Sequence, residues 1–439
     1  AIADILCADA NPSGKLVDTF AGSFDDYPSS AGFNDSDDYV DYTEDIYVGY
    51  RYFETIPGAA EKVNYPFGYG LSYTSFAIRN CCGRLEKAED GTQIVVEASV
   101  TNVGKLAGKE VVQLYYSAPQ GRLGKPARAL GAFAKTRCLQ PGETQQVTLR
   151  LAADSMASYD DTGKIAKSAY VMEAGEYRFY LGNSVRNTEK VSFVYKEEAD
   201  RVVLVLKERV APRQLAKRML ADGSFEELPV QAECKAERFP GFVEGNPPHK
   251  GHWEGDTTAN ERGADAPEKK IMLMDVVNGD ASMEEFLAQL TNGQLIDLLC
   301  GQPNTGVANT FGMGNLPEYG VPNLMTADGP AGVRIRPGLG VCTTAWPCAT
   351  LLACTWNPDL VYEIGAAGAR EMKENNLGIW LTPAMNIHRS PLCGRNFEYY
   401  SEDPLIAGKM AAAKVNGIQS EHIGASIKHF ACNNKETNR

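Results

Sequence analysis

Residues 283–439 alternate between helix-like and strand-like segments, and this rhythm constrains the fold more than any other feature of the chain. Helical patterns occupy 284–290, 358–375 and 404–419, while short apolar segments at 323–327, 378–382 and 425–430 predict strands. Strands that alternate with helices form parallel sheets, either open or closed into a (β/α)8 barrel. Because a complete barrel takes about 250 residues, we expect this stretch to hold only the first half of a truncated barrel.

A different pattern, the alternation of apolar and polar residues, runs through 77–197. Successive side chains of a strand point to opposite faces, so apolar residues two positions apart share a face, as at Val112, Leu114 and Tyr116. The same spacing recurs at 147, 149 and 151 and at 177, 179 and 181, with turn-forming residues between these segments. Short antiparallel strands over about 120 residues predict a β-sandwich.

The two remaining stretches carry weaker patterns. Residues 1–76 are rich in glycine, tyrosine and aspartate, and they contain too little regular apolar pattern to bury a core alone. Residues 198–282 are charged and mixed, with a helix-like segment at 214–220 and a Gly-, Pro- and His-rich stretch at 240–267. We interpret 198–282 as a long, partly flexible connector.

Composition narrows the classes of partner and the cellular setting. With 56 acidic against 43 basic residues the formal net charge is −13, whereas nucleic-acid binding needs clustered Lys and Arg. No apolar run approaches the ~18 residues that cross a membrane. The 11 cysteines include no C-x-x-C pair, which favours buried, reduced thiols and a cytoplasmic location. Because the chain opens with Ala1 and not with Met, we expect the natural N-terminus to be missing, so secretion stays open.

Common catalytic and cofactor motifs are absent from the sequence. Neither a G-x-S-x-G nucleophile turn nor a Walker A loop occurs. His249 and His252 lie in the connector without two further ligands nearby, so no metal site is predicted. Gly365 and Gly368 lie in the middle of a helix pattern, where they favour close helix packing over phosphate binding. Neutral ligands, including sugars, remain open.

Charged residues follow the predicted strands of the C-terminal stretch. Asp328 follows the strand at 323–327, Arg395 lies on the loop after 378–382, Lys428 and His429 end the strand at 425–430, and Arg439 lies just beyond. In a (β/α) barrel this end of the strands is the active-site face. Taken singly, Asp328 also fits a turn or a helix cap, and Arg395 a surface ion pair. Together these residues favour a polyhydroxylated ligand, whose hydroxyls need both donors and acceptors.

These motifs resemble the sugar-binding signatures of glycoside hydrolase family 3. The signatures are DGP at 328–330 with Arg334 beyond it, GRN at 394–396 and KHF at 428–430. Segments 11–16, 47–52 and 65–73 resemble the end of that family's α/β sandwich domain, and 100–104 and 108–115 resemble its fibronectin type III-like domain.

The resemblance implies a multidomain α/β plus all-β organisation. Residues 1–76 would be the C-terminal part of the α/β sandwich domain, 77–197 the fibronectin type III-like β-sandwich, 198–282 the connector, and 283–439 the N-terminal half of the (β/α)8 glycosidase barrel. This order, with the barrel last, is similar to that of a subset of bacterial β-glucosidases.

The resemblance also implies roles for single residues. Asp328 would accept hydrogen bonds from hydroxyls of the terminal sugar, which occupies the −1 subsite. The other substrate contacts would come from Arg334, Arg395, Lys428, His429 and Arg439. Adjacent residues of a regular strand point to opposite faces, so Lys428 and His429 reach one sugar only where the backbone is irregular. The family precedent is a non-proline cis peptide bond, which we expect between them.

The family mechanism requires two catalytic carboxyl groups ~5–5.5 Å apart. The Asp nucleophile would follow Arg439, and the Glu acid/base would precede Ala1. Glu398 and Glu402 match substrate-loop residues and not catalysts. We therefore expect an inactive fragment of an enzyme that removes terminal, non-reducing β-D-glucosyl residues from glucosides or oligosaccharides, without metal or organic cofactor. A homo-oligomer is compatible with the sequence.

Three alternatives stay open on the sequence alone. Two are enzymes of the same family: a β-xylosidase and an N-acetylglucosaminidase. The third is a non-catalytic product that binds sugars or a partner.

Overall fold

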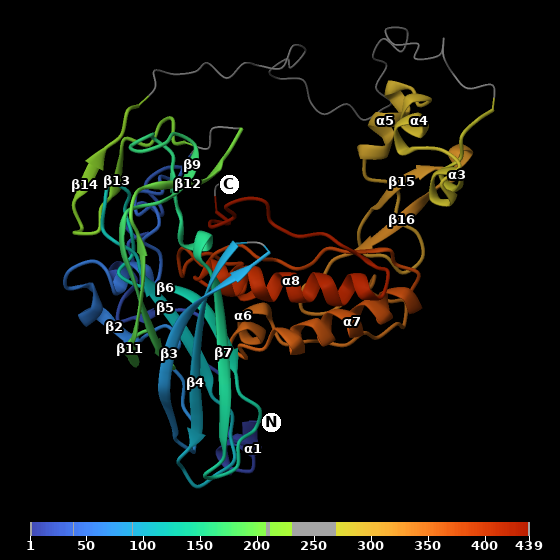
Figure 1. The fold of residues 1–439 in the computed structure, drawn as a ribbon. Helices are drawn as coiled ribbons and strands as arrows, with labels where there is room; N and C mark the ends of the chain where they lie inside the picture. Colours follow the sequence, from blue (N-terminus) through green and yellow to red (C-terminus); the bar gives the residue numbers. More distant parts are fainter. Residues whose placement is uncertain (1, 38, 90, 208–210, 231–268, 438–439) are drawn as a thin grey trace.

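The computed structural model describes residues 2–37, 39–89, 91–207, 211–230 and 269–437 (Figure 1). Two strand-rich bodies and one helical layer dominate the described chain. The strands of 76–197 form one body, and a smaller sheet joins the helices of the C-terminal part. No helix within the described ranges has the length and apolarity to cross a bilayer.

The predicted β-sandwich of the middle region is present as two antiparallel sheets. One sheet holds β3 (Phe76–Ala88), β4 (Gly91–Asn102) and β7 (Thr144–Ala152), and the other holds β5 (Val111–Ser117), β6 (Ala129–Lys135), β10 (Gly175–Gly182) and β11 (Thr188–Glu197). Their facing side chains form one core that includes all three sets of alternating apolar residues predicted above. Burial of these two sheet faces is the main source of stability for this body.

Strand β5 is buried on both of its faces. Val112 and Leu114 point into the sandwich core, whereas Val111 and Tyr115 belong to a second core with Tyr50 and Trp356. A strand that is buried on both faces loses the simple alternation of burial, and the burial of every residue in 111–115 reflects this. The sandwich therefore offers its outer face to the rest of the chain.

The C-terminal sheet has the order β15-β16-β17-β18. Its strands are β15 (Gly312–Leu316), β16 (Val321–Ala327), β17 (Ile379–Trp380) and β18 (Gly424–Ala425). β15 runs antiparallel to β16, while β16, β17 and β18 are parallel, as the helix–strand alternation predicts. Helix α7 (Pro358–Glu374) connects β16 to β17, and α8 (Pro404–Ser420) connects β17 to β18.

Both long helices begin where the sequence predicts. The side chain of Asn357 accepts a hydrogen bond from the Leu360 amide at the start of α7, and Asp403 does the same for Leu405 and Ile406 in α8. A proline follows each of these caps, in the first turn of the helix. The two helices lie side by side (Figure 1).

Gly365 and Gly368 have the packing role that was predicted for them. A Cβ at Gly365 would lie 2.6 Å from the carbonyl oxygen of Lys414 in α8, and one at Gly368 would lie 2.3 Å from the ring of Trp380. Four shorter helices complete this part of the chain: α3 (Leu273–Asn278), α4 (Met283–Ala288), α5 (Asn292–Leu299) and α6 (Ala349–Ala353).

The described residues of 1–76 contain little regular structure and form no large core of their own. Their elements are α1 (Ile2–Leu6), β1 (Phe20–Ala21), the 3-10 helix η1 (Phe24–Asp26), α2 (Tyr50–Phe53), the 3-10 helix η2 (Ala59–Lys62) and β2 (Val63–Tyr65). Their buried side chains pack on other parts of the chain. Phe67 lies 5.6 Å from Trp356, whose ring is 5.2 Å from Phe133 of β6. This segment, the sandwich and the helical layer thus share one core.

The connector differs from its prediction at 214–220, which was expected to be helical. The segment contains strand β13 (Lys217–Met219), which pairs with β14 (Phe225–Glu227) across a turn at Gly223, where φ is +83°. The Met219 amide also donates to the Thr43 carbonyl, so tertiary pairing overrides the local helical pattern. Further strand pairing occurs in the order β12 (Arg201–Val205), β9 (Ala169–Met172) and β8 (Ser158–Asp160). The stretch 240–267 lies outside the described residues.

Two further predictions are wrong. The strand predicted at 425–430 is only two residues long, Gly424–Ala425, because the Thr382 amide of the neighbouring segment turns back to the Trp380 carbonyl and leaves the ladder. Lys428 joins Ala384 by a single bridge. The ten described cysteines are free, but only Cys393 is buried, so the expectation of buried thiols fails for the other nine.

Candidate functional site

An ion-pair centre lies at the ends of the parallel strands. Lys428 Nζ lies 2.7 Å from Asp328 Oδ1, although 100 positions separate the two residues. The second carboxylate oxygen of Asp328 accepts a hydrogen bond from Arg334 at 3.0 Å. The side chain of Lys428 is 16% exposed and that of Arg334 is 63% exposed, so the centre is half-buried and open on the arginine side.

The loop that carries Asp328 is fixed by several hydrogen bonds. It leaves β16, and the Asp328 amide donates to Asn309 Oδ1 at 3.1 Å. From β17, Trp380 Nε1 donates to the Gly329 carbonyl at 3.0 Å, and from α8, Lys414 Nζ donates to the Pro330 carbonyl at 2.6 Å. Both of these side chains are fully buried, so they hold the loop against the helical layer.

Arg395 enters the same centre through a glutamate. It stands directly before the 3-10 helix η5 (Asn396–Glu398), and its guanidinium pairs with Glu398. The other carboxylate oxygen of Glu398 lies 3.9 Å from Lys428 Nζ. Glu398 is buried, so these two cations balance its charge.

His429 lies beside the ion-pair centre and contacts a tyrosine. Its Nδ1 is 3.0 Å from the hydroxyl of Tyr399, which also accepts a hydrogen bond from Asn433 at 2.7 Å. The peptide bond between Lys428 and His429 is cis, as expected, and the bond between Phe430 and Ala431 is also cis, which was not predicted. A pocket of about 600 Å³ borders this region and is lined by His429 and Asn433 among others.

The structure thus brings Asp328, Arg334, Arg395 and Lys428 into one charged cluster and places His429 beside it. Arg439, the sixth predicted site residue, lies outside the described residues.

Sequence reasoning did not predict the contacts of four side chains that support this cluster. Glu398 bridges two cations, Tyr399 contacts His429, and Trp380 and Lys414 hold the Asp328 loop. Glu398 carried one signal, its position three residues after Arg395, which suits pairing across one helical turn.

The electrostatics of the cluster favour an ionised Asp328. Burial alone would raise the pKa of this carboxyl, but the hydrogen bond from Lys428, the Gly329 amide and the charge of Arg334 together hold the pKa below its ordinary value of 3.8. An ionised carboxylate accepts hydrogen bonds and cannot donate them, whereas Lys428 and Arg395 only donate. Neighbouring hydroxyl groups that both donate and accept would match this set.

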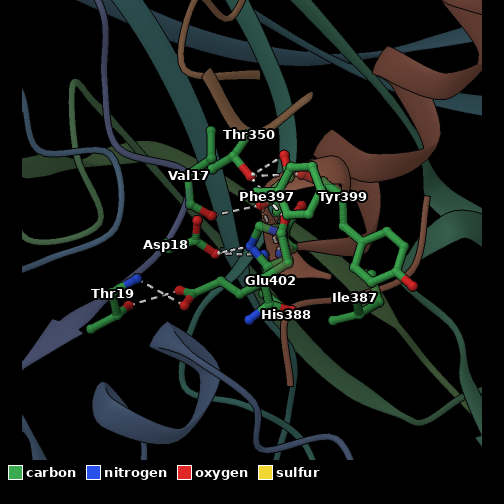
Figure 2. Close-up of polar contacts among 12 residues, drawn as sticks. Val17, Asp18, Thr19, Thr350, Ile387, His388, Phe397, Tyr399 and Glu402 are labelled. Atoms are coloured by element: carbon green, nitrogen blue, oxygen red, sulfur yellow. Dashed lines mark hydrogen bonds and ion pairs between the residues drawn. The ribbon is translucent and has the colours of Figure 1, made fainter. Parts of the chain in front are cut away.

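A second polar cluster joins residues 1–76 to the loop that carries Arg395 (Figure 2). His388 Nδ1 lies 2.6 Å from Asp18 Oδ1, and His388 Nε2 lies 2.8 Å from the Asn396 carbonyl oxygen. Buried Glu402 accepts hydrogen bonds from the amide and hydroxyl of Thr19 and from the Tyr50 amide. The cluster borders a pocket of about 370 Å³.

The described part of the chain holds no group of three or more His, Cys, Asp or Glu side chains arranged to bind a metal ion.

Two family models match the chain. Residues 110–185 match the fibronectin type III-like domain, and residues 270–438 match the glycosyl hydrolase family 3 N-terminal domain. The fibronectin type III-like match covers strands of the sandwich, and the family 3 match covers the ion-pair centre.

Curated relatives match along the whole chain. The chain is 55% identical to β-glucosidase A from Butyrivibrio fibrisolvens over all of its own length and 55% of the relative, and 42% identical to a β-glucosidase from Ruminococcus albus over 45% of that protein. A crystal structure of a β-glucosidase from Paenibacillus barengoltzii superposes with a TM-score of 0.87 and 44% identity, covering all of this chain and 48% of the other.

The chain therefore spans about half the length of the relatives it matches. Similarity along the whole of this chain, together with the two family matches and the shared fold, shows that the chain belongs to glycoside hydrolase family 3.

Proposed function

We propose that the protein represented by this chain is a β-glucosidase that removes terminal, non-reducing β-D-glucosyl residues from glucosides or oligosaccharides. The observation that carries the proposal is the pairing of Lys428 with Asp328, with Arg395 and Glu398 beside it. This centre combines charged donors with a charged acceptor in a half-buried setting, which suits recognition of adjacent sugar hydroxyls. The names of the full-length relatives support glucose as the sugar.

In this proposal Asp328 accepts hydrogen bonds from two hydroxyls of the −1 sugar, and Lys428, His429 and Arg395 contact the others. Arg334 lies on the open side of Asp328 and orients its carboxylate. Arg439 would complete the set. These contacts position the anomeric carbon, and they favour the oxocarbenium-like transition state where their bonds strengthen as charge develops.

The two catalytic carboxylates of the retaining mechanism are assigned to the part of the relatives' length that this chain does not span. The described chain offers Glu398 and Glu402 as buried carboxylates, but Glu398 pairs with Arg395, and Glu402 accepts three hydrogen bonds from Thr19 and Tyr50. Both are occupied by contacts within the chain. We therefore expect this chain to bind glucose without hydrolysing glucosides.

The domain arrangement belongs to the same proposal. Residues 1–76 would end an α/β sandwich domain, 77–197 form the fibronectin type III-like domain, 198–282 connect, and 283–439 begin the (β/α)8 barrel. The parallel order of β16, β17 and β18, with α7 and α8 as crossovers, supports a barrel beginning. Cytoplasmic location also remains a proposal.

The test uses the whole protein, at the length of its relatives, on nitrophenyl β-glucoside, β-xyloside and N-acetyl-β-glucosaminide. We expect a clear preference for the glucoside. A preference for the xyloside would replace the proposal by a β-xylosidase, and no hydrolysis of any of the three would contradict it.

A variant tests the site itself. Lys428→Met keeps the length of the side chain but removes a charged donor, so it should lower kcat/KM on nitrophenyl β-glucoside by about tenfold or more. Lys409→Met, at an exposed position of α8, is the matched control and should change kcat/KM less than twofold. Equal kinetics of the two variants would remove Lys428 from the site.

A further inference from the structure

The ring of His388 is held between two acceptors. Its Nδ1 faces Asp18 Oδ1 at 2.6 Å and its Nε2 faces the Asn396 carbonyl oxygen at 2.8 Å (Figure 2). A backbone carbonyl cannot donate, and the same Asp18 oxygen already accepts the Glu402 amide at 3.1 Å. Both ring nitrogens must therefore donate, and only the imidazolium form carries a proton on each nitrogen.

The backbone around His388 is fixed independently of its ring. The His388 amide donates to the Ser401 carbonyl, and Ile387 bridges Ser401. The Ser401 hydroxyl donates to the Val17 carbonyl at 2.7 Å, next to Asp18. The ring of His388 thus connects Asp18 to the Asn396 carbonyl, and hydrogen bonds through Ser401 hold the His388 segment beside residues 17 and 18 without the ring.

The Asn396 carbonyl connects this ring to the sugar-binding cluster. Asn396 is the first residue of η5, between Arg395 and Glu398. Its carbonyl also accepts a hydrogen bond from the Thr350 hydroxyl at 3.0 Å. The Tyr399 amide closes the turn on the same carbonyl, while Thr350 lies in α6 and His388 in a separate segment, so the two side chains tie this turn to two other parts of the chain.

We propose that His388 is a positioning residue for Arg395 and Glu398, and that Asp18 of the N-terminal segment keeps its ring charged and oriented. The inference rests on the proposed sugar-binding function of that turn. By this inference, Asp18 links residues 1–76 to the alignment of the −1 site. No described side chain of that segment belongs to the Asp328–Lys428 centre itself.

The charges around His388 favour this assignment. Asp18 and Glu402 face the ring from one side, while the neighbouring Arg389 is neutralised by buried Glu44. Burial by itself disfavours the charged ring, but the carboxylate of Asp18 and the Asn396 carbonyl raise the pKa of His388 above its ordinary value of 6.5. Glu402 adds to this shift only when it is ionised, because burial and the neighbouring Asp18 raise the pKa of Glu402 itself to about 8. The centre of the Tyr399 ring lies 6.4 Å from that of the His388 ring.

The first experiment needs no variant. The C2 and Nε2 resonances of His388 are followed by NMR from pH 5 to pH 8.5 in the 439-residue chain, with histidine-selective labels. We expect the midpoint of the His388 titration to lie above the ordinary value of 6.5. A midpoint near 6.5 would overturn the inference, whether or not the chain binds glucose.

The second experiment links the ring to sugar binding. Asp18→Asn keeps the shape and the bond from the Glu402 amide but removes the charge, so burial is no longer offset and the ring should lose its proton at a lower pH than in the wild type. The Kd for D-glucose in Asp18→Asn should then increase about five- to tenfold between pH 5.5 and pH 7.5, relative to the wild-type chain. The exposed Asp25→Asn, in the same segment, is the control and should follow the wild type.

The outcomes separate the inference from the proposed function. If Asp18→Asn and Asp25→Asn bind glucose with the same pH dependence, the positioning role is wrong and the function stands. If the wild-type chain binds no glucose, the proposed function fails. In that case amide exchange across 394–399 decides: faster exchange in Asp18→Asn than in Asp25→Asn supports positioning, and equal exchange overturns it.

Discussion

Lys414 is the residue whose environment departs most from that of an ordinary surface lysine. It is buried in α8, and its Nζ donates to the Pro330 carbonyl and lies 4.8 Å from the centre of the Trp380 ring. Burial, aided by the nearby charge of Lys428, lowers the pKa of Lys414 from its ordinary 10.5 to about 7. A buried cation is costly, and here it fixes the loop that carries Asp328.

This environment predicts a pH dependence of stability. Because the pKa of Lys414 is lower in the folded state, the unfolded chain binds the extra proton between about pH 7 and pH 10.5. The stability that depends on Lys414 therefore rises with pH across this window and is lost as pH falls through about 7. The difference in free energy of unfolding between wild type and Lys414→Met should grow by about 1–3 kcal/mol from pH 6.5 to pH 9.

Urea denaturation at both pH values measures this difference. Lys409→Met, an exposed position of the same helix, should show no such growth. A Lys414→Met difference that is constant with pH would mean that the ammonium is not desolvated by its surroundings.

At the residue scale, the sequence analysis identified charged residues at the ends of predicted strands, and the fold brings them together. Asp328 was singled out because it follows a predicted strand and Lys428 because it lies at the end of another, and the structure pairs them. Glu398 was assigned to a substrate loop without its ion pairs, and Lys414 was not singled out, for a physical reason. Their importance comes from a 3.9 Å contact with Lys428 and from the Pro330 carbonyl, and both contacts exist only after the chain has folded.

At the scale of elements, α7 packs closely on its neighbours because glycines at the contact have no side chain. Gly368 lies against the fully buried ring of Trp380, and a Cβ there would be 2.3 Å from ring carbons. Gly408 of α8 has nothing within 4 Å of its added Cβ. The two glycines lie in long neighbouring helices, but only at Gly368 is the space that a Cβ would need already occupied.

This contrast gives a matched pair of variants. Gly368→Ala should lower the free energy of unfolding by about 1–3 kcal/mol, because the added methyl group overpacks a core that cannot move aside. Gly408→Ala should raise it by about 0.5–1 kcal/mol, because alanine loses less conformational freedom in a helix than glycine does. Thermal or urea unfolding of both variants checks the prediction, and a similar sign for the two would show that Trp380 yields easily.

Element prediction worked for segments with strong periodicity and clear caps. Helices α7 and α8 were predicted from the helical patterns at 358–375 and 404–419, and the structure shows Asn357 and Asp403 as their caps. The helix predicted at 214–220 failed, since β13 pairs with β14 and with Thr43, partners that no local pattern reveals. The strand predicted at 425–430 ended early, because the Thr382 amide of the neighbouring segment donates to the Trp380 carbonyl and not to this strand.

At the scale of the whole molecule, one core spans three sequence regions. Trp356 contacts Phe67 from the first 76 residues and Phe133 from the sandwich, and its Nε1 donates to the Lys15 carbonyl. The sequence predicted that residues 1–76 could not bury a core alone, but it could not show where their aromatic side chains would pack. Their contacts with the Arg395 loop explain how a segment distant in sequence bears on the site.

The central claim is that side chains from separate strands hold one pyranose ring. The most direct test is a crystal structure of the 439-residue chain soaked in D-glucose. We predict one glucose whose hydroxyls lie within hydrogen-bonding distance of both Asp328 and Lys428, with His429 on the same ring. Glucose bound elsewhere, or an unchanged Asp328–Lys428 pair without sugar at saturating concentration, would contradict the claim.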